Sequence, residues 1–185
     1  MKKIILILLI ILNITSLGEA NMNKVLVIGL DGATFDIILP WIKQGKLPNF
    51  EKLISEGSYG NLTSTLPTVS PVAWTSFATG VNPGKHGIFG FLTDYESTPV
   101  TRIDIKSKTF WEIASENGKR VIIMNVPMTY PPEEINGIII SGYESPEEEI
   151  FTYPENLTEE LIAKGYKTEA LDKRFETGED RKSVV

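Results

Sequence analysis

A short apolar run, Val25 to Leu30, constrains this chain more than any other feature, and it ends directly on Asp31 and Gly32. Its length and its valine and isoleucine content predict a strand buried on both faces, as in a parallel sheet. Asp31 is therefore expected at the carboxyl end of a strand. Ligands of open α/β sheets bind at that edge, so the Asp31 carboxylate is a candidate metal ligand.

The rest of the chain predicts alternating helices and strands, which favours the α/β class. Pro48 is expected at the first turn of a helix, and Gly57 is placed to end it. Further helices are predicted over 71–79, from a cap at Ser107 to Gly118, and over 156–164, with strands over 60–65, 121–126 and 138–141.

Composition limits the classes of partner and chemistry. The 185 residues have a net charge of −6 and no stripe of lysine or arginine, which argues against binding nucleic acid. The absence of cysteine excludes disulfides, thiolate metal sites and cysteine nucleophiles. A small anionic substrate would need a metal ion to bind here.

The first twenty residues have the layout of an export signal: two lysines, nine unbroken aliphatic residues from Ile4 to Leu12, and small residues before a cut after Ala20. We expect residues 1–20 to be a signal peptide or membrane anchor and the protein to be extracytoplasmic or membrane-anchored. The alternative is that translation starts at Met22 and the protein is cytoplasmic.

Ser70 is a candidate catalytic residue because it stands just before Pro71 at the predicted start of a helix. Backbone N–H groups at a helix start favour a bound anion, so a phosphoryl group could lie against the turn that presents the hydroxyl. The simpler interpretation is that Ser70 only caps the helix. The two roles are compatible.

Other candidates are weaker. Asp31 could serve only the Asp-Gly turn. The segment Gly80 to His86 is one residue short of a P-loop and lacks its Ser or Thr, although Lys85 could still meet an anion. His86 is expected to be a packing residue rather than a metal ligand, because no histidine or acid lies at ligand spacing from it.

The combination of motifs is more specific than its parts. Asp31-Gly32 is followed by LPNFEKL (47–53), PTVSPVAWTSFATG (67–80), NPGKHGI (82–88) and NVPMTYPPEEINGIIISGYESP (125–146). In order and spacing these resemble the N-terminal part of the type I phosphodiesterase/nucleotide pyrophosphatase family, within the alkaline phosphatase superfamily. The resemblance implies an alkaline-phosphatase-like α/β core with a largely parallel sheet flanked by helices, present here only in part over residues 24–185.

The resemblance also implies chemistry. Members of the family hydrolyse phosphate esters or nucleotides with two divalent ions, for which zinc is expected and manganese is the alternative. By matching motifs, Asp31 would bind one ion, and Ser70, bound to the same ion, would be the nucleophile. No cofactor other than these ions is implied.

This sequence departs from the family pattern in its ligands. The family uses three further histidines and additional aspartates, whereas this chain has one histidine. An asparagine that holds a phosphoryl oxygen in nucleotide pyrophosphatases is matched here by Phe91. We therefore expect the N-terminal fragment of a hydrolase, inactive alone, whose missing half could lie on a separate chain.

Two alternatives belong to other classes. The chain could be a non-catalytic α/β binding protein that keeps a partial metal or anion site at Asp31. It could also be an unrelated phosphatase with an aspartyl nucleophile, but that mechanism usually needs a second aspartate where this chain has Ala33.

Overall fold

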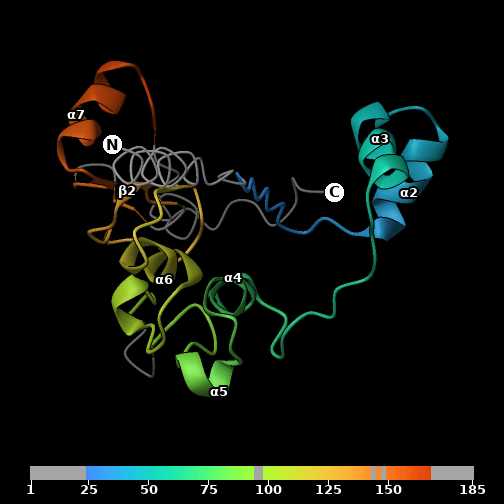
Figure 1. Cartoon of the computed structure of the whole chain (residues 1–185). Helices are drawn as coiled ribbons and strands as arrows, with labels where there is room; N and C mark the ends of the chain where they lie inside the picture. The colour runs from blue at the N-terminus through green and yellow to red at the C-terminus, as the bar shows by residue number, and fades with distance from the viewer. Residues whose placement is uncertain (1–23, 94–97, 143–144, 147–148, 168–185) are drawn as a thin grey trace, which may run out of the picture. The chain divides into compact units, whose positions relative to one another are not determined.

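The computed structural model describes residues 24–93, 98–142, 145–146 and 149–167 (Figure 1). The predicted signal over residues 1–20 lies outside these residues. The chain divides into two units between Leu30 and Asp31, and each is described by itself. Among the described residues, no helix combines the length and the apolar character needed to cross a membrane.

Helices fill the first part of the second unit, three strands follow, and a last helix ends its described part, so the fold mixes α and β structure but its elements do not alternate as predicted (Figure 1). In chain order the elements are α2 (Phe35–Lys43), α3 (Pro48–Glu56), α4 (Ser70–Thr79), α5 (Pro83–His86), a short 3-10 helix η1 (Arg102–Asp104), α6 (Phe110–Glu116), β1 (Val121–Met124), β2 (Gly137–Ile140), β3 (Thr152–Tyr153) and α7 (Asn156–Ala163).

The described sheet is mixed, not largely parallel as predicted. Strands β1 and β2 are parallel, with Val121 opposite Gly137, and the two-residue strand β3 runs antiparallel to β2. The crossover from β1 to β2 approaches closely at Gly137, where an added Cβ would lie 1.7 Å from the carbonyl oxygen of Val121. Glycine at this position lets the two parallel strands pair.

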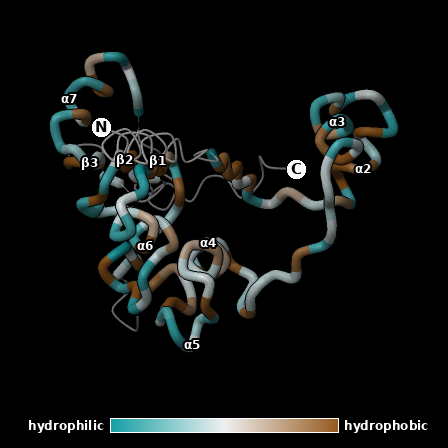
Figure 2. The backbone as a smooth tube through the Cα atoms, viewed as in Figure 1, coloured by the Kyte–Doolittle hydropathy of each residue, from teal (hydrophilic) through white to brown (hydrophobic). Residues whose placement is uncertain are grey.

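The prediction of a buried strand over Val25–Leu30 was wrong for the described structure. These residues form no strand, and Val25 and Leu26 are each 83% exposed. Figure 2 shows the apolar character of this segment, which is coloured brown. The predicted strand over 60–65 is also absent. A strand forms only where a neighbour pairs with its backbone, and the described sheet is built from residues 121–153 alone.

The predictions for α3, α4 and α7 are confirmed in place, with one correction at α4. Pro48 lies in the first turn of α3 and Gly57 ends it. The residue that caps α4 is Val69, so Ser70 is the first residue of the helix and not its cap. Pro71 fixes a backbone that already suits a first helical turn, which lets the helix begin one residue earlier than predicted.

The predicted cap of α6 was also wrong. Thr109, not Ser107, precedes the helix, and its Oγ1 accepts a hydrogen bond from the Glu112 backbone N–H at 3.3 Å. The Glu112 carboxylate reaches back to the Thr109 N–H at 2.6 Å, which completes a capping box. Ser107 and Thr109 both fit the preference for a helix cap. Glu112, three positions after Thr109, favours Thr109 because only Thr109 can form the capping box with it.

Helix α2 was not predicted, because Pro40 lies inside it and an internal proline normally ends a helix. Thr34 caps it, with its side chain accepting a hydrogen bond from the Asp36 N–H at 3.3 Å. Helix α2 packs against α3. Phe35 and Tyr59 meet edge to face beside this pair, with ring centroids 5.4 Å apart.

Two apolar clusters form the core of the second unit. One gathers around α4 and the loops near it, and the other joins α4 and α6 to the sheet. The first contains Val72, Ile88, Val100, Ile105 and Met128; the second contains Ala78, Trp111, Ile123, Ile135 and Ile139. Helix α4 contributes a buried residue to each cluster, so the helix that carries Ser70 is fixed on two sides.

The carboxyl ends of β1 and β2 are fastened together by side chains. Thr129 Oγ1 accepts a hydrogen bond from the Gly142 N–H at 3.1 Å, and Ser141 Oγ donates to the Thr129 carbonyl oxygen at 2.8 Å. Beyond α7, Tyr166 donates to Asn125 Oδ1 at 3.1 Å and stacks on Phe151 at 5.8 Å between ring centroids. These contacts hold the loop after β1 in one conformation.

Candidate functional site

Helix α4 presents Ser70 from a firmly packed base. Pro71 and Val72 are buried directly after it, and the helix ends at Gly80 in a left-handed conformation with φ 68°. Ser70 itself is only partly buried, so its hydroxyl can be reached from solvent. A packed helix start with an accessible hydroxyl is a suitable setting for a nucleophile.

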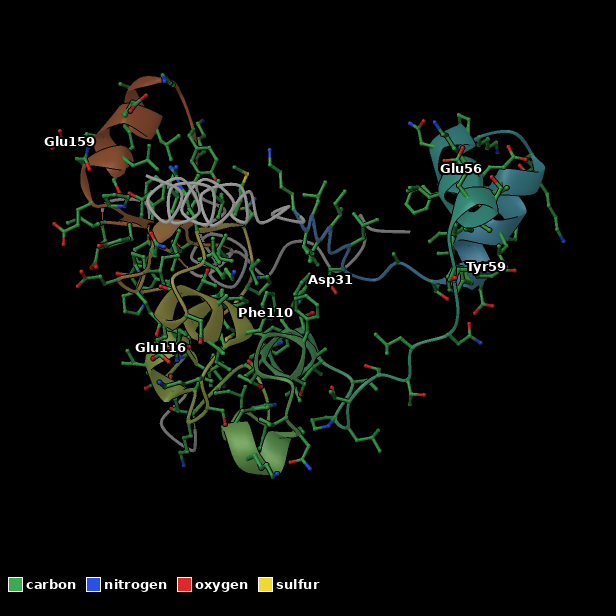
Figure 3. All side chains as sticks on the ribbon, in the orientation of Figure 1. Asp31, Glu56, Tyr59, Phe110, Glu116 and Glu159 are labelled. Atoms are coloured by element: carbon green, nitrogen blue, oxygen red, sulfur yellow. The ribbon has the colours of Figure 1, made fainter. Side chains whose placement is uncertain are left out.

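The structure brings Ser70 and Asp31 together across 39 positions of the chain. Ser70 Oγ donates a hydrogen bond to Asp31 Oδ2 at 3.2 Å, and the pair is exposed. Asp31 begins a tight turn with Gly32, whose φ is +68° (Figure 3 labels Asp31). Asp31 therefore takes part in the Asp-Gly turn and also contacts Ser70.

The first turn of α4 leaves backbone donors available. Val69 stands at the cap position, and its apolar side chain cannot accept a hydrogen bond from them. N–H groups without a capping side chain and the positive end of the helix dipole favour an anion next to Ser70. An anionic group in this place would lie beside the Asp31 carboxylate, which repels it unless a cation lies between them.

A divalent cation fits this pair in part. Asp31 and Ser70 offer two oxygen ligands, which suit zinc, manganese or magnesium. Within the described ranges, no group of three or more His, Cys, Asp or Glu side chains is placed to hold a metal ion. The described residues thus supply two ligands of a site that needs at least four in total.

His86 is a packing residue, as predicted. It is fully buried, its Nε2 lies 2.9 Å from Ser76 Oγ, and its Nδ1 accepts a hydrogen bond from the Ile88 N–H at 3.1 Å. Burial lowers the pKa of the imidazole. Both ring nitrogens are engaged within the protein, so neither is free to bind a metal ion.

The other residues weighed from the sequence lie on the surface. Lys85 is exposed, and its proposed contact with an anion stays a prediction. Phe91, which matches the asparagine of nucleotide pyrophosphatases, is also exposed, and its carbonyl oxygen accepts a hydrogen bond from Val100 N–H at 2.9 Å.

A buried ionic cluster at Arg102 was not predicted. Nη2 of Arg102 lies 2.8 Å from Glu112 Oε2 and 2.5 Å from Glu133 Oε1. Burial raises the pKa of Glu133, an effect opposed by Arg102 and reinforced by Glu112. The members of the cluster come from η1, α6 and the loop before β2, so no local spacing could have indicated it.

The aromatic residues of α4 and α6 form a chain of edge-to-face contacts. Phe77 meets Trp74 at 5.9 Å and Phe110 at 5.6 Å between ring centroids, and Phe110 meets Trp111 at 5.0 Å (Figure 3 labels Phe110). Such pairs stabilise beyond the area they bury. They fix α4 against α6 and so contribute to the placement of Ser70.

Comparison with known proteins identifies the lineage. The model of the family described as type I phosphodiesterase/nucleotide pyrophosphatase matches residues 25–183. Neither the curated proteins nor the solved structures contain a match. The matched region includes Asp31, Ser70 and every motif named from the sequence. The chain therefore belongs to the type I phosphodiesterase/nucleotide pyrophosphatase family.

Proposed function

We propose that this chain contributes the nucleophile and one metal ligand of a metal-dependent phosphoric ester hydrolase, and that it is inactive alone. The observation that carries the proposal is the 3.2 Å contact between Ser70 Oγ and Asp31 Oδ2. Family membership supports a phosphate ester or nucleotide as the substrate.

In this proposal Ser70 Oγ attacks phosphorus, and the bond from phosphorus to the leaving oxygen breaks. A phosphoryl-serine or nucleotidyl-serine forms, which water then hydrolyses to restore the hydroxyl. The N–H groups at the start of α4 bind the phosphoryl oxygens, and Asp31 orients Ser70. A divalent ion held by Asp31 and Ser70 would supply the charge that stabilises the serine alkoxide.

The proposal that the chain is inactive alone follows from its ligand count. A carboxylate by itself is too weak a base to keep a serine hydroxyl deprotonated. The sequence holds one histidine, and His86 is buried with both nitrogens bonded. The remaining ligands for the two divalent ions, zinc or manganese, would come from residues other than those that the structure describes, on the same protein or on a separate chain.

Two measurements on the purified chain test the proposal. Calorimetric titration with Mn²⁺ or Zn²⁺ should detect one weak site that is lost in Asp31→Asn. Asp36→Asn is the matched control, because Asp36 is another exposed aspartate five positions away, on α2. Hydrolysis of an activated phosphodiester with either metal added should stay at the background rate.

The outcomes separate the parts of the proposal. Equal metal binding by the wild-type chain and Asp31→Asn would contradict the ligand role of Asp31. Robust turnover that disappears in Ser70→Ala would support the nucleophile and overturn inactivity. Tight binding of one ion without turnover would favour the second candidate function, a non-catalytic binding protein, which the shortage of ligands in the described residues also supports.

A further inference from the structure

The environment of His86 determines which ring nitrogen carries its proton. The Ile88 N–H donates to Nδ1 at 3.1 Å, so Nδ1 must hold a lone pair. The single proton of a neutral imidazole then lies on Nε2, which faces Ser76 Oγ at 2.9 Å. This arrangement accepts no second proton without breaking a contact, because a proton on Nδ1 would face the Ile88 N–H.

The contacts of His86 join two elements next to the candidate nucleophile. Ser76 lies on α4, the helix that begins with Ser70, whereas His86 ends α5. Ile88, which donates to the ring, shares an apolar cluster with Val72, two residues after Ser70. The imidazole thus links the turn over residues 83–88 to the middle of α4. Ile88 packs the same turn against the start of α4.

The charged residues beside His86 in the described structure are lysines. Lys85 precedes it on α5. On the other side, the Lys106 N–H donates to the His86 carbonyl oxygen at 2.9 Å, and the Lys106 side chain packs beside Gly87. From α4 the facing group is the uncharged Ser76 hydroxyl. In the part of the chain that the structure describes, no carboxylate bonds to the ring.

We propose that neutral His86 is a positioning residue that locks the turn over residues 83–88 onto α4, and that protonation of its Nδ1 breaks the contact with the Ile88 N–H and so loosens the packing of Ile88 on Val72, two residues after Ser70. The catalytic consequence rests on the proposed function of Ser70. The positioning role of His86 does not depend on that function.

The pH dependence has a definite sign. Burial lowers the pKa of His86 below its ordinary value of 6.5. The unfolded chain therefore takes up a proton near pH 6.5, while the folded chain resists it. His86 contributes stability that is present above pH 6.5 and is lost as the pH falls through the lower pKa of the folded state.

The chain is well suited to a direct test because His86 is its only histidine. Nitrogen-15 NMR of the imidazole in the full chain should show the proton on Nε2 at neutral pH. It should also show a titration midpoint clearly below pH 6.5. The backbone amides of Ser70 and Val72 should shift with the same midpoint as the ring, a response that a purely local packing role would not produce.

Two variants isolate the lock. His86→Gln keeps a donor that can reach Ser76 but cannot take up a proton, so the amide shifts of Ser70 and Val72 with pH should disappear. Ser76→Ala removes only the acceptor, and it should raise the His86 midpoint as the turn loosens. Ser55→Ala is the control, since Ser55 is an exposed helical serine on α3 whose hydroxyl bonds locally, to the Lys52 carbonyl oxygen.

Three results would overturn the proposal: a proton on Nδ1 at neutral pH, an ordinary midpoint near pH 6.5, or a titration of the ring that leaves the α4 amides unmoved. If His86→Gln fails to fold, the wild-type and Ser76→Ala titrations still decide. These readouts involve neither metal nor substrate. Equal metal binding by the wild-type chain and Asp31→Asn would therefore count against the proposed function but not against the positioning role of His86.

Discussion

Nη2 of Arg102 lies 2.8 Å from Oε2 of Glu112, the same carboxylate oxygen that accepts hydrogen bonds from the N–H and Oγ1 of Thr109. One oxygen thus joins an ion pair to the cap of α6. Glu133 completes the cluster at the same Nη2. The start of α6 and the 3-10 helix η1 are therefore held by a single charged centre.

Replacing Arg102 with methionine should destabilise the fold by about 3 kcal/mol, because it leaves two partly buried carboxylates facing each other without a cation. Urea denaturation followed by circular dichroism measures the loss. Lys108→Met is the matched control: its ammonium pairs with Glu116 at an exposed position, where ion pairs contribute little. A similar loss of stability in both variants would show that the burial of the Arg102 cluster has no energetic effect.

Thr109→Ala should cost about 1–2 kcal/mol of stability, because it removes the side chain that caps α6. Ser107→Ala should cost less than about 0.5 kcal/mol, since Ser107 makes one long, exposed contact with the Lys85 carbonyl oxygen at 3.4 Å. Thermal unfolding of the two variants side by side is the measurement. The reverse order would restore Ser107 as the cap.

Gly137→Ala should prevent the native pairing of β1 with β2, because its Cβ would lie 1.7 Å from the backbone oxygen of Val121. We expect loss of more than about 3 kcal/mol or failure to fold. Gly60→Ala is the control, since a methyl group added there would meet nothing within 4 Å and its backbone requires no left-handed conformation. Chemical denaturation compares them, and equal stability would mean that the crossover can shift without cost.

Tyr130 should be among the last tyrosines to ionise, because burial, and then its hydrogen bond to Glu149, raise its pKa to about 12. Its folded-state pKa lies above its unfolded value of 10, so its contribution to stability is present below pH 10 and is lost as the pH rises toward 12. Phenolate absorbance in an alkaline titration should lose a late component in Tyr130→Phe.

Glu149→Gln supplies the control for that titration. It removes the charge and keeps the side chain's size, so the Tyr130 midpoint should fall but remain above 10, since burial is the larger cause. An unchanged midpoint would show that the Glu149 contact does not persist in solution.

The helices were predictable where proline and glycine mark their ends, as at Pro48, Gly57 and Gly80. Helix α2 was not, because tertiary packing tolerates Pro40 where local rules forbid it. The strand predicted over Val25–Leu30 followed from composition, but pairing with a neighbour decides whether a strand forms, and composition does not supply the neighbour. Two-residue β3 is too short to leave any periodic signal.

The candidate site was likewise predictable only in part from the sequence. Asp31 and Ser70 were predictable as a pair because the motifs that contain them resemble those of the family. The Asp-Gly pair also indicated the turn at Gly32, but the 3.2 Å separation depends on how α4 packs through Val72, which no sequence pattern encodes. The packing role of His86 was predictable, because no histidine or acid lies at ligand spacing from it. Its partner Ser76 became evident only from the structure.

The bond from Tyr166 to Asn125 spans 41 positions and ends on a residue whose φ is +58°, a conformation that asparagine adopts at some cost. The phenol therefore helps to hold Asn125 in this conformation. Loss of this hydrogen bond would release Asn125, the residue that directly follows β1.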